Sequence, residues 1–406
     1  MSTHDIRVLE SEDDLIQAGN LFRTAMIGFP PLTEQQRSLI GKLSEPERTL
    51  GVFVDGRLAA TADSTTSTLT LPGGARVGHA AVTHVGVLPS HTRRGIATDL
   101  LEHQLRDIAD GGEVVASLRA SEATIYERFG YGVASSTATI EVRTRRAALR
   151  PEVGSGGPVR LVEPGHEWDV LARIYADNRG SRPGRIDRNA TWWLNQQMRA
   201  EANPAARFTA VHGSPGAETG FVRYHPVDTD AWFVSEQRSV VVDDLFAPTD
   251  EAYLGLLRFL LDLDLVDRVV FSLAPVDDPL PWLLQDRRAA VVTGVRDETW
   301  LRVVDVAAAL RGRSYANADT LTLRVEDPVL AANTATYAIS RGSVETTTAP
   351  AGLQTSVAGL GAALLGGTRW SDLALAGVVR VDDTAALRTA DELFAVSQAP
   401  HSGIYF

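Results

Sequence analysis

The residues best suited to chemistry lie at positions 85–98, where an apolar stretch is followed by two arginines and a glycine. This order of residue types predicts a strand that ends at Pro89, a short loop, and a helix that begins at Gly95. The free N–H groups and the dipole of a first helical turn favour an anion. Arg93 and Arg94 could add charge-assisted hydrogen bonds, and a glycine lets the backbone approach a ligand closely. The stretch therefore predicts a phosphate-binding site.

The elements on either side of this stretch are expected to hold it in place. The helix continues through apolar residues at helical spacing, and a strand at 113–118 follows the break at Gly111 and Gly112. Asp55 and Gly56, between two apolar runs, predict a hairpin. The other expected elements are a strand at 6–9, a helix at 15–22, hairpin strands at 49–54 and 57–61, and a strand at 80–87. Their order up to residue 118 is β-α-β-β-β-α-β.

The run from Thr92 to Ala97, after a Val-x-Val strand, resembles the acyl-coenzyme A signature Q/R-x-x-G-x-G/A of the GNAT acetyltransferases. Thr92 departs from it, because the family has Gln or Arg at that position. The resemblance implies that acetyl-coenzyme A is the co-substrate and that no metal is needed. It implies that the pantetheine arm and acetyl group are held by Val85, Gly86 and Val87. It also implies that the phosphates are held by Arg93, Arg94, Gly95, Ile96, Ala97 and Thr98, with Ser121 and Glu122 lying along the coenzyme.

Two tyrosines follow the strand at 113–118. Residues 121–132 predict a short helix and then a turn at two glycines. By its position in the family, Tyr126 on the short helix would lie beside the coenzyme sulfur. Tyr131, in the Phe-Gly-Tyr-Gly turn, is expected to pack in the core.

Composition limits the chemistry further. The chain has 406 residues, a net charge of -12 and no cysteine. The absence of cysteine excludes disulfides, thiolate metal sites and a cysteine nucleophile, so acyl transfer would be direct or use another nucleophile. The acidic balance argues against nucleic acid as the main partner. Because neither a signal peptide nor an apolar run long enough for a membrane helix is visible, a cytoplasmic protein without a membrane partner is expected.

The rest of the chain predicts two more domains. Residues 240–242, 252–262 and 268–273 repeat the strand, helix and strand of the first domain, but Asp250 and Glu251 would repel pyrophosphate there. From residue 291 the order of elements resembles the sterol carrier protein fold, with a helix expected at 353–365. The expected fold class is α/β (α+β), with tandem GNAT acetyltransferase domains and then a sterol-carrier-like domain. The expected ranges are 1–150, with a coenzyme site, 151–290, without one, and 291–406.

These domains in this order, with Tyr126 and an aromatic last residue, resemble the Eis (enhanced intracellular survival) family of aminoglycoside N-acetyltransferases. The resemblance implies that the α-carboxylate of Phe406 reaches the first domain and takes a proton from the acceptor amine. Tyr126 would then protonate the leaving thiolate, and backbone N–H groups of the strand at 85–87 would stabilise the acetyl oxygen. It also implies a cationic small-molecule amine as acceptor, aminoglycosides and antibiotic resistance, and a homo-oligomer, a hexamer in family members.

The acceptor pocket is harder to predict. The stretch at 22–36 offers Phe22, Phe29 and Glu34 but no tryptophan. Met26 and Gln36 occupy the positions where relatives have an acid and an aromatic, so neither role is carried over to them. His84, Asp99 and His401 are further candidates by proximity. Two alternatives remain open. One is the same chemistry on protein lysines or small polyamines, and the other is a non-catalytic lipid or sterol carrier that works through the C-terminal module.

Overall fold

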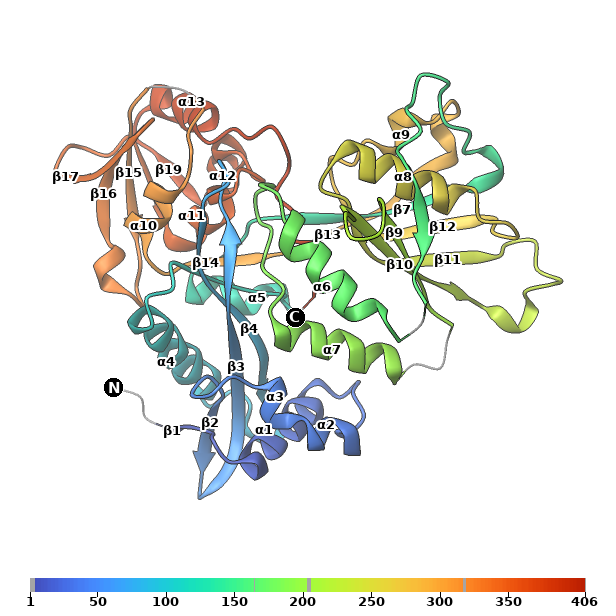
Figure 1. The fold of residues 1–406 in the computed structure, drawn as a ribbon. Coiled ribbons are helices and arrows are strands. Elements are labelled where there is room, and N and C mark those ends of the chain that lie inside the picture. The colour runs from blue at the N-terminus through green and yellow to red at the C-terminus, as the bar shows by residue number, and fades with distance from the viewer. Residues whose placement is uncertain (1–3, 164, 203–205, 317–318, 406) are drawn as a thin grey trace.

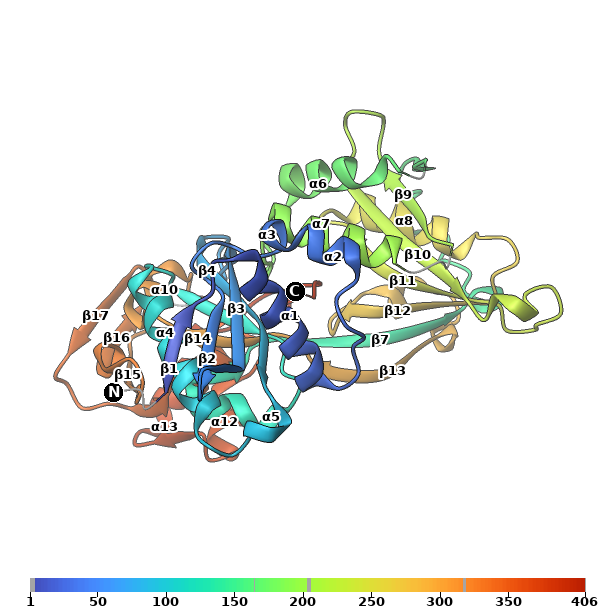
Figure 2. The same ribbon diagram turned by 90° about the horizontal axis from the view of Figure 1, so that it is seen from below.

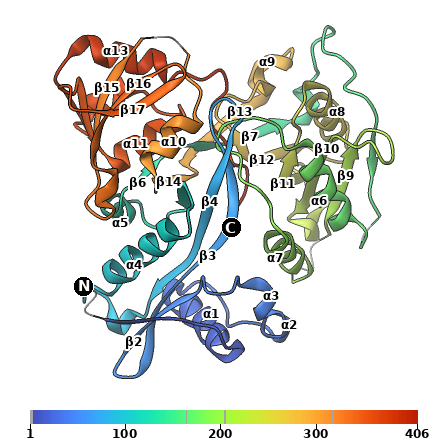
Figure 3. The ribbon, with the colours of Figure 1, turned by 60° about the vertical axis from the view of Figure 1, so that its left-hand side comes forward.

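The computed structural model describes residues 4–163, 165–202, 206–316 and 319–405 and contains three β-sheets (Figure 1). Two of the sheets have seven strands and the third has five. Each sheet belongs to a separate lobe, and the lobes meet around the long β3–β4 hairpin (Figures 1 and 3). Within the described residues, no helix has both the length and the apolar character that a membrane span requires.

The first sheet carries the predicted β-α-β-β-β-α-β order. Its strands, from edge to edge, are β1 (Asp5–Val8), β2 (Leu50–Val54), β3 (Arg57–Thr70), β4 (Arg76–Val87), β5 (Val115–Leu118), β14 (Trp300–Val303) and β6 (Tyr131–Val133). Its helices are α1 (Glu12–Met26), α2 (Glu34–Ser38), α3 (Ile40–Leu43), α4 (Ile96–Asp110) and α5 (Ala123–Tyr126). Asp55 and Gly56 adopt φ of 51° and 74°, which confirms the predicted tight hairpin between β2 and β3.

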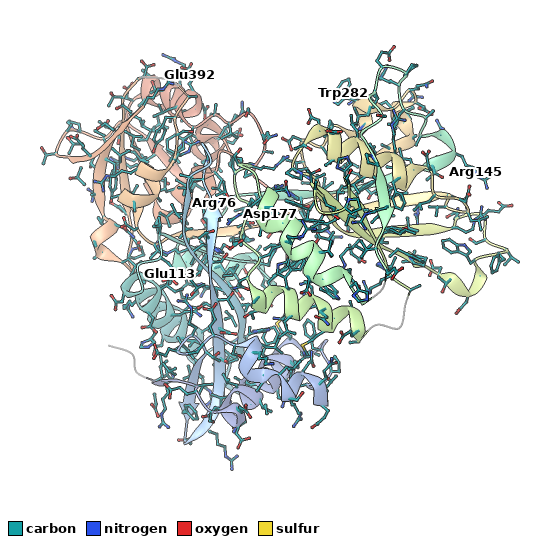
Figure 4. All side chains as sticks on the ribbon, in the orientation of Figure 1. Arg76, Glu113, Arg145, Asp177, Trp282 and Glu392 are labelled. Carbon is teal, nitrogen blue, oxygen red and sulfur yellow. The ribbon has the colours of Figure 1, made fainter. Side chains whose placement is uncertain are left out.

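The second sheet repeats this pattern in the middle of the chain. Its strands, in order, are β13 (Ala290–Asp297), β7 (Ser136–Arg143), β12 (Arg268–Pro275), β11 (Ser239–Phe246), β10 (Gly220–Val227), β9 (Phe208–His212) and β8 (Val159–Leu161). Its helices are α6 (Glu167–Asn178), α7 (Ala190–Glu201), α8 (Asp250–Leu261) and α9 (Leu280–Leu283). β11 and β12 are parallel and joined by α8, as the sequence predicts. Arg145 and Trp282 lie on the outer side of this lobe, away from the first sheet (Figure 4).

The third sheet forms the C-terminal lobe. Its strands, in order, are β17 (Ser343–Thr347), β16 (Ala335–Ser340), β15 (Leu321–Glu326), β18 (Leu353–Ser356) and β19 (Val379–Val381). Its helices are α10 (Val306–Gly312), α11 (Val357–Leu364), α12 (Trp370–Leu375) and α13 (Thr384–Leu393). The sequence predicted a helix from residue 353, and this prediction was wrong for residues 353–356. These four residues form strand β18, which pairs with β15 and β19. The helix begins only after Ser356, whose side chain caps it by accepting the Gly359 N–H.

The sheets exchange strands along the chain. β14 follows the second lobe in sequence but lies in the first sheet, between β5 and β6, and β7 lies in the second sheet. On β14, the fully buried Arg302 donates two hydrogen bonds of 2.7 Å to Asp327 of the third lobe. A Cβ on Gly132 of β6 would lie 2.0 Å from the Ala358 carbonyl oxygen, so α11 packs directly on the first sheet. The boundaries at residues 150 and 290 stay predictions, and the shared strands fix the lobes against one another.

Candidate functional site

The first sheet opens between β4 and β5. These parallel strands pair only from His79 to Ala81 on β4, and beyond Ala81 no described strand pairs with this edge. On the other side of β4 the register with β3 shifts, so that His84 and Val85 lie opposite a single residue, and His84 has φ of 50°. A bulge of this kind bends the strand and redirects its peptide groups. The edge at Val85, Gly86 and Val87 can therefore hydrogen-bond to an extended ligand.

The loop after β4 leads to an open helix N-terminus. The 3-10 turn η1 (Pro89–His91) precedes Arg93, with φ of 61°, and Gly95, with φ of 80°. The Gly95 carbonyl already accepts the N–H groups of Thr98 and Asp99 at 3.0 and 3.1 Å, so α4 begins here. Residues 92–95 are exposed, whereas the Ile96 side chain is 1% exposed and anchors the helix in the core. The loop thus presents two arginines and the N–H groups of a first helical turn.

Gly95 offers a test of this loop. A Cβ there would meet no atom within 4 Å, so Gly95→Ala adds only the strain of φ 80°, about 1–2 kcal/mol, and a methyl group toward the ligand. We expect the KM for acetyl-coenzyme A to rise about tenfold. Gly56→Ala, at φ 74° and equally open, is the matched control. An unchanged KM in Gly95→Ala would contradict a close approach of the coenzyme.

Tyr126 lies where β4 and β5 separate. Its ring is 6% exposed and packs in one apolar cluster with Val82 and Leu118, against which Val85 also packs. Burial raises the pKa of the Tyr126 hydroxyl, although a hydrogen bond with the Ser121 side chain acts in the opposite direction. The hydroxyl is therefore protonated near neutral pH and can donate a proton.

The structure brings most of the predicted coenzyme residues together. Val85 packs against the cluster of Tyr126 and also against that of Ile96, which joins the strand edge to the loop. Ser121 and Glu122 are exposed beside Tyr126. Tyr131 is fully buried, which confirms its predicted packing in the core. Phe406 lies outside the described residues.

The chain segment before Phe406 is fixed by contacts with residues of the second lobe. Asp277 accepts the Ala399 N–H at 2.8 Å, and Arg182 donates to the Ala399 carbonyl at 2.9 Å. The Pro183 carbonyl accepts the His401 N–H at 2.9 Å. At the end, the Trp192 indole N–H on α7 donates to the Tyr405 carbonyl at 2.6 Å. Residues 399–405, called the tail below, therefore run between α7 and the first sheet (Figures 1 and 3).

Glu298 is the central anchor of the tail. Its side chain is fully buried and accepts the Ser402 N–H at 3.0 Å, the Ser402 hydroxyl at 3.0 Å and the Gly403 N–H at 2.8 Å. Nη2 of Arg119 lies 3.3 Å from Oε1 of Glu298, and Arg119 also donates to the Ile404 carbonyl. Burial by itself would raise the pKa of Glu298, but His401, Arg119 and the donors on Ser402 lower it to about 2. The carboxylate is therefore ionised and holds the tail in one conformation.

Helices α1, α2 and α7 lie near one another (Figure 2). Residues of these helices line a cavity of about 560 Å³. We call it the α1–α7 cavity. Its lining includes Phe22, Arg23, Phe29, Leu32, Gln36, Asp63, His84, Met198, Arg199 and Tyr405. A hydrogen bond of 2.8 Å from Gln35 to Glu201 joins α2 to α7 beside it. Because both β4 and the tail reach this cavity, it can bring an acceptor to the strand edge.

The predicted acceptor residues divide between this cavity and other places. Phe22, Phe29, Gln36 and His84 line the cavity, whereas Met26 and Glu34 are not among its lining residues. The Asp99 carboxylate on α4 hydrogen-bonds to His4 at 2.7 Å, and neither residue is among those that line the cavity. His401 lies in the tail, 3.5 Å from Glu298, where burial lowers its pKa. Sequence reasoning missed Glu298, Arg119, Trp192 and Arg199, because single polar residues far apart in the chain carry no local signal.

Family models match three parts of the sequence. Residues 5–134 and 184–303 each match an acetyltransferase (GNAT) domain, and residues 306–403 match a sterol carrier protein domain. An uncharacterised N-acetyltransferase of Streptomyces coelicolor is 34% identical to this chain, and the match covers 98% of each protein. N-acetyltransferase Eis of Mycobacterium tuberculosis is 34% identical over 341 residues, 80% of each chain. These matches confirm the predicted order of domains.

Solved structures agree with this assignment. The crystal structure of Eis1 from Mycobacterium abscessus has a TM-score of 0.93 and 44% identity, with 100% of both chains covered. A GCN5-related N-acetyltransferase from Anabaena variabilis has a TM-score of 0.82 at 20% identity, with 99% of this chain and 100% of that chain covered. The second structure shows that the same fold persists at low sequence identity.

Proposed function

Because the chain belongs to the Eis family of GNAT N-acetyltransferases, we propose that it transfers the acetyl group of acetyl-coenzyme A directly to a small-molecule amine in the first lobe. One observation carries this proposal. The open edge of β4, the Gly95 loop and the buried Tyr126 hydroxyl border the same opening between β4 and β5. The fold of the family uses acetyl-coenzyme A, and the residues around this opening are suited to its parts.

In this proposal each part of the coenzyme has its own partners. The pyrophosphate lies on Arg93, Arg94 and the N–H groups of residues 95–97, which combine two cations with a helix N-terminus. The pantetheine amides pair with the free edge of β4 as an added strand. The acetyl oxygen accepts N–H groups at the bulge beside Val85, and these stabilise the charge that develops on it. Ser121 and Glu122 lie along the coenzyme.

The transfer needs one base and one acid. The protonated acceptor amine loses a proton to the base and its nitrogen attacks the acetyl carbon. The carbon–sulfur bond breaks, and the nitrogen releases a second proton to solvent as the amide forms. The leaving thiolate takes the proton of the Tyr126 hydroxyl, which solvent then restores. The proposed base is the α-carboxylate of Phe406. The anchored tail supports this role, because Tyr405 lines the α1–α7 cavity and Trp192 holds its carbonyl.

Chain extension tests the terminal base. A few residues appended after Phe406 move the carboxylate away, so we expect kcat to fall at least tenfold while acetyl-coenzyme A still binds. The same residues appended before Met1 serve as the control. Equal kcat values for the two extended proteins would remove Phe406 as base and leave the transferase proposal in place.

The second lobe is proposed to lack a coenzyme site. A cavity of about 350 Å³ lies at the matching opening between β11 and β12, and its lining carries Asp243, Asp244, Asp250, Asp277 and Asp278. The first residues of α8 are Asp250 and Glu251, which would repel a pyrophosphate group. Gln398 and the tail residues His401 and Gly403 also line this cavity. These features support one coenzyme per chain.

The third lobe is proposed to serve packing and assembly rather than lipid transport. All residues of α11 are buried, and Gly361 of this helix would place a Cβ 2.4 Å from the Leu301 carbonyl oxygen of the first sheet. The helix therefore packs directly against the catalytic lobe. A homo-oligomer, a hexamer by family resemblance, remains part of the proposal.

Two measurements test the proposed function. Calorimetry should show one acetyl-coenzyme A bound per chain, and a thiol assay should detect coenzyme A release with amine acceptors. The panel holds kanamycin for the predicted aminoglycosides, spermidine for polyamines and a lysine peptide for proteins. Coenzyme binding without release on any amine would contradict the proposed reaction. Absence of binding, with lipid in the purified protein, would instead favour the carrier alternative.

A further inference from the structure

The charges in the α1–α7 cavity limit what it can bind. The ionisable side chains of Arg23, Arg199, Asp63 and His84 line it. The protein as a whole has a net charge of -12, so an excess of arginine at this cavity runs against the general composition. The question is which of these charges face a ligand.

The Asp63 carboxylate is used within the wall of the cavity. Its side chain is 5% exposed, and its Oδ1 accepts the Ser64 N–H at 2.8 Å and the Thr49 hydroxyl at 3.2 Å. Its Oδ2 lies 3.4 Å from Nδ1 of His84. Three neighbours therefore already occupy the oxygens of this carboxylate and hold it in the wall, which leaves few acceptor sites for a ligand amine.

The two arginines are not compensated in this way. Arg23 on α1 donates to the Pro30 carbonyl at 2.9 Å, and it pairs with no carboxylate in the described part of the chain. The Arg199 side chain on α7 makes neither a hydrogen bond nor an ion pair with a described residue, and the residue is exposed. Partial burial and the charge of Arg199 lower the pKa of Arg23. The two cations on opposite walls repel each other, and an anionic group of a ligand between them would relieve that repulsion beside the terminal carboxylate that is proposed as base.

Positive charge continues beyond Arg199. Arg199 and Tyr405 also line a neighbouring cavity of about 250 Å³, together with Arg207 and Arg223. Arg223 is 7% exposed and stacks at 4.2 Å on Trp168, without a hydrogen bond to a described residue. The carboxylates of this second cavity are already paired, Asp244 with Arg188 at 2.7 Å and Asp243 with Arg207 at 3.0 Å.

The remaining wall of the α1–α7 cavity is apolar. Phe22, Phe29, Leu32 and Met198 line it between the arginines and the bulge of β4. A ligand that places its amine at the bulge therefore extends over apolar side chains toward Arg199. We propose that the natural acceptor is an amine with an apolar body and an anionic group, a carboxylate or a phosphate, that Arg199 binds together with Arg23. This proposal rests on the proposed function and names the acceptor class for the same site.

A matched set of amines tests the acceptor class. Aminooctanoate, octylamine and diaminooctane share one chain and end in an anion, a methyl group and a cation. We expect kcat/KM to be at least tenfold higher for aminooctanoate than for octylamine, and lowest for diaminooctane and kanamycin. Aminohexyl phosphate against aminohexanoate shows which anion the arginines prefer. A preference for diaminooctane or kanamycin would overturn the proposal.

Variants of Arg199 connect the preference to its cause. In Arg199→Gln, the ratio of kcat/KM for aminooctanoate to that for octylamine should fall close to one, and in Arg199→Glu diaminooctane should become the better substrate. Arg296→Gln, an exposed arginine on β13, is the control and should keep the wild-type ratio. An unchanged ratio in both Arg199 variants would also overturn the proposal. If no amine of any charge releases coenzyme A, the proposed function itself fails, which is a different result.

Discussion

Replacing Glu298 with alanine is expected to lower the free energy of unfolding by about 3–5 kcal/mol and to reduce kcat at least a hundredfold. The variant leaves the N–H groups of Ser402 and Gly403 and the guanidinium of Arg119 without their acceptor inside the protein. The tail then loses its fixed path, and with it the position of the proposed terminal base. Glu298 acts on the reaction through the tail and is therefore a positioning residue.

The measurements separate positioning from stability. Urea unfolding gives the free energy, and kcat is measured at a temperature where the variant is folded. The affinity for acetyl-coenzyme A, measured by calorimetry, should stay close to that of the wild type, because Glu298 is not among the residues that are proposed to bind the coenzyme. Glu152→Ala, an exposed glutamate in the connection between β7 and β8 of the second lobe, is the control. A folded Glu298→Ala protein with normal kcat would restrict Glu298 to a structural role.

The pH dependence of stability gives a second readout for Glu298. Its pKa is about 2 in the folded protein against an ordinary value of 4.5, so its ionisation stabilises the fold by roughly 3 kcal/mol above pH 4.5. This contribution is lost as the pH falls from 4.5 toward 2. Between neutral and acidic pH, the wild type should lose more stability than Glu298→Gln. Parallel losses in the two proteins would contradict an ionised Glu298.

Replacing Tyr126 with phenylalanine is expected to reduce kcat at least a hundredfold, with little change in stability. The change removes only the hydroxyl that would protonate the thiolate, and the buried ring keeps its packing. The loss should be smaller with an activated thioester whose thiol is more acidic, because such a leaving group needs less help from an acid.

Tyr131 supplies the matched control for Tyr126. The two rings lie 6.1 Å apart, and Tyr131 is also buried, but its hydroxyl has no hydrogen-bond partner among the described residues. Tyr131→Phe should therefore keep full kcat and be at least as stable as the wild type, since an unsatisfied buried hydroxyl is lost. Equal losses in both variants would indicate a packing effect, and a normal kcat in Tyr126→Phe would exclude it as the acid.

Features with a local signal were predictable from the sequence. Asp55 and Gly56 determine a hairpin, and Gly95 with two arginines identifies a loop before a helix, because turn geometry depends on adjacent residues. Residues 353–356 read as the start of a helix since they run into an apolar stretch, and only pairing with distant strands makes them β18. The placement of β14 in the first sheet depends on such pairing too.

The candidate site divides in the same way. The coenzyme loop and Tyr126 lie within about forty residues of each other and resemble a known signature, so both were predicted. Glu298 precedes a strand as one acidic residue among many, and its role arises only when the tail returns to it from more than a hundred residues away. Arg199 looks like an ordinary helix-surface residue until α7 is placed opposite α1.

The most direct test of the central claim is to identify the product. The untagged protein is incubated with isotope-labelled acetyl-coenzyme A and the amine panel, and the amines are analysed by mass spectrometry. We predict one or more amines that carry the labelled acetyl group, with an equal amount of free coenzyme A, and at least a hundredfold slower formation in Tyr126→Phe. Coenzyme A that is bound but never released, with no labelled amine, would contradict an N-acetyltransferase that acts on small-molecule amines through this cleft.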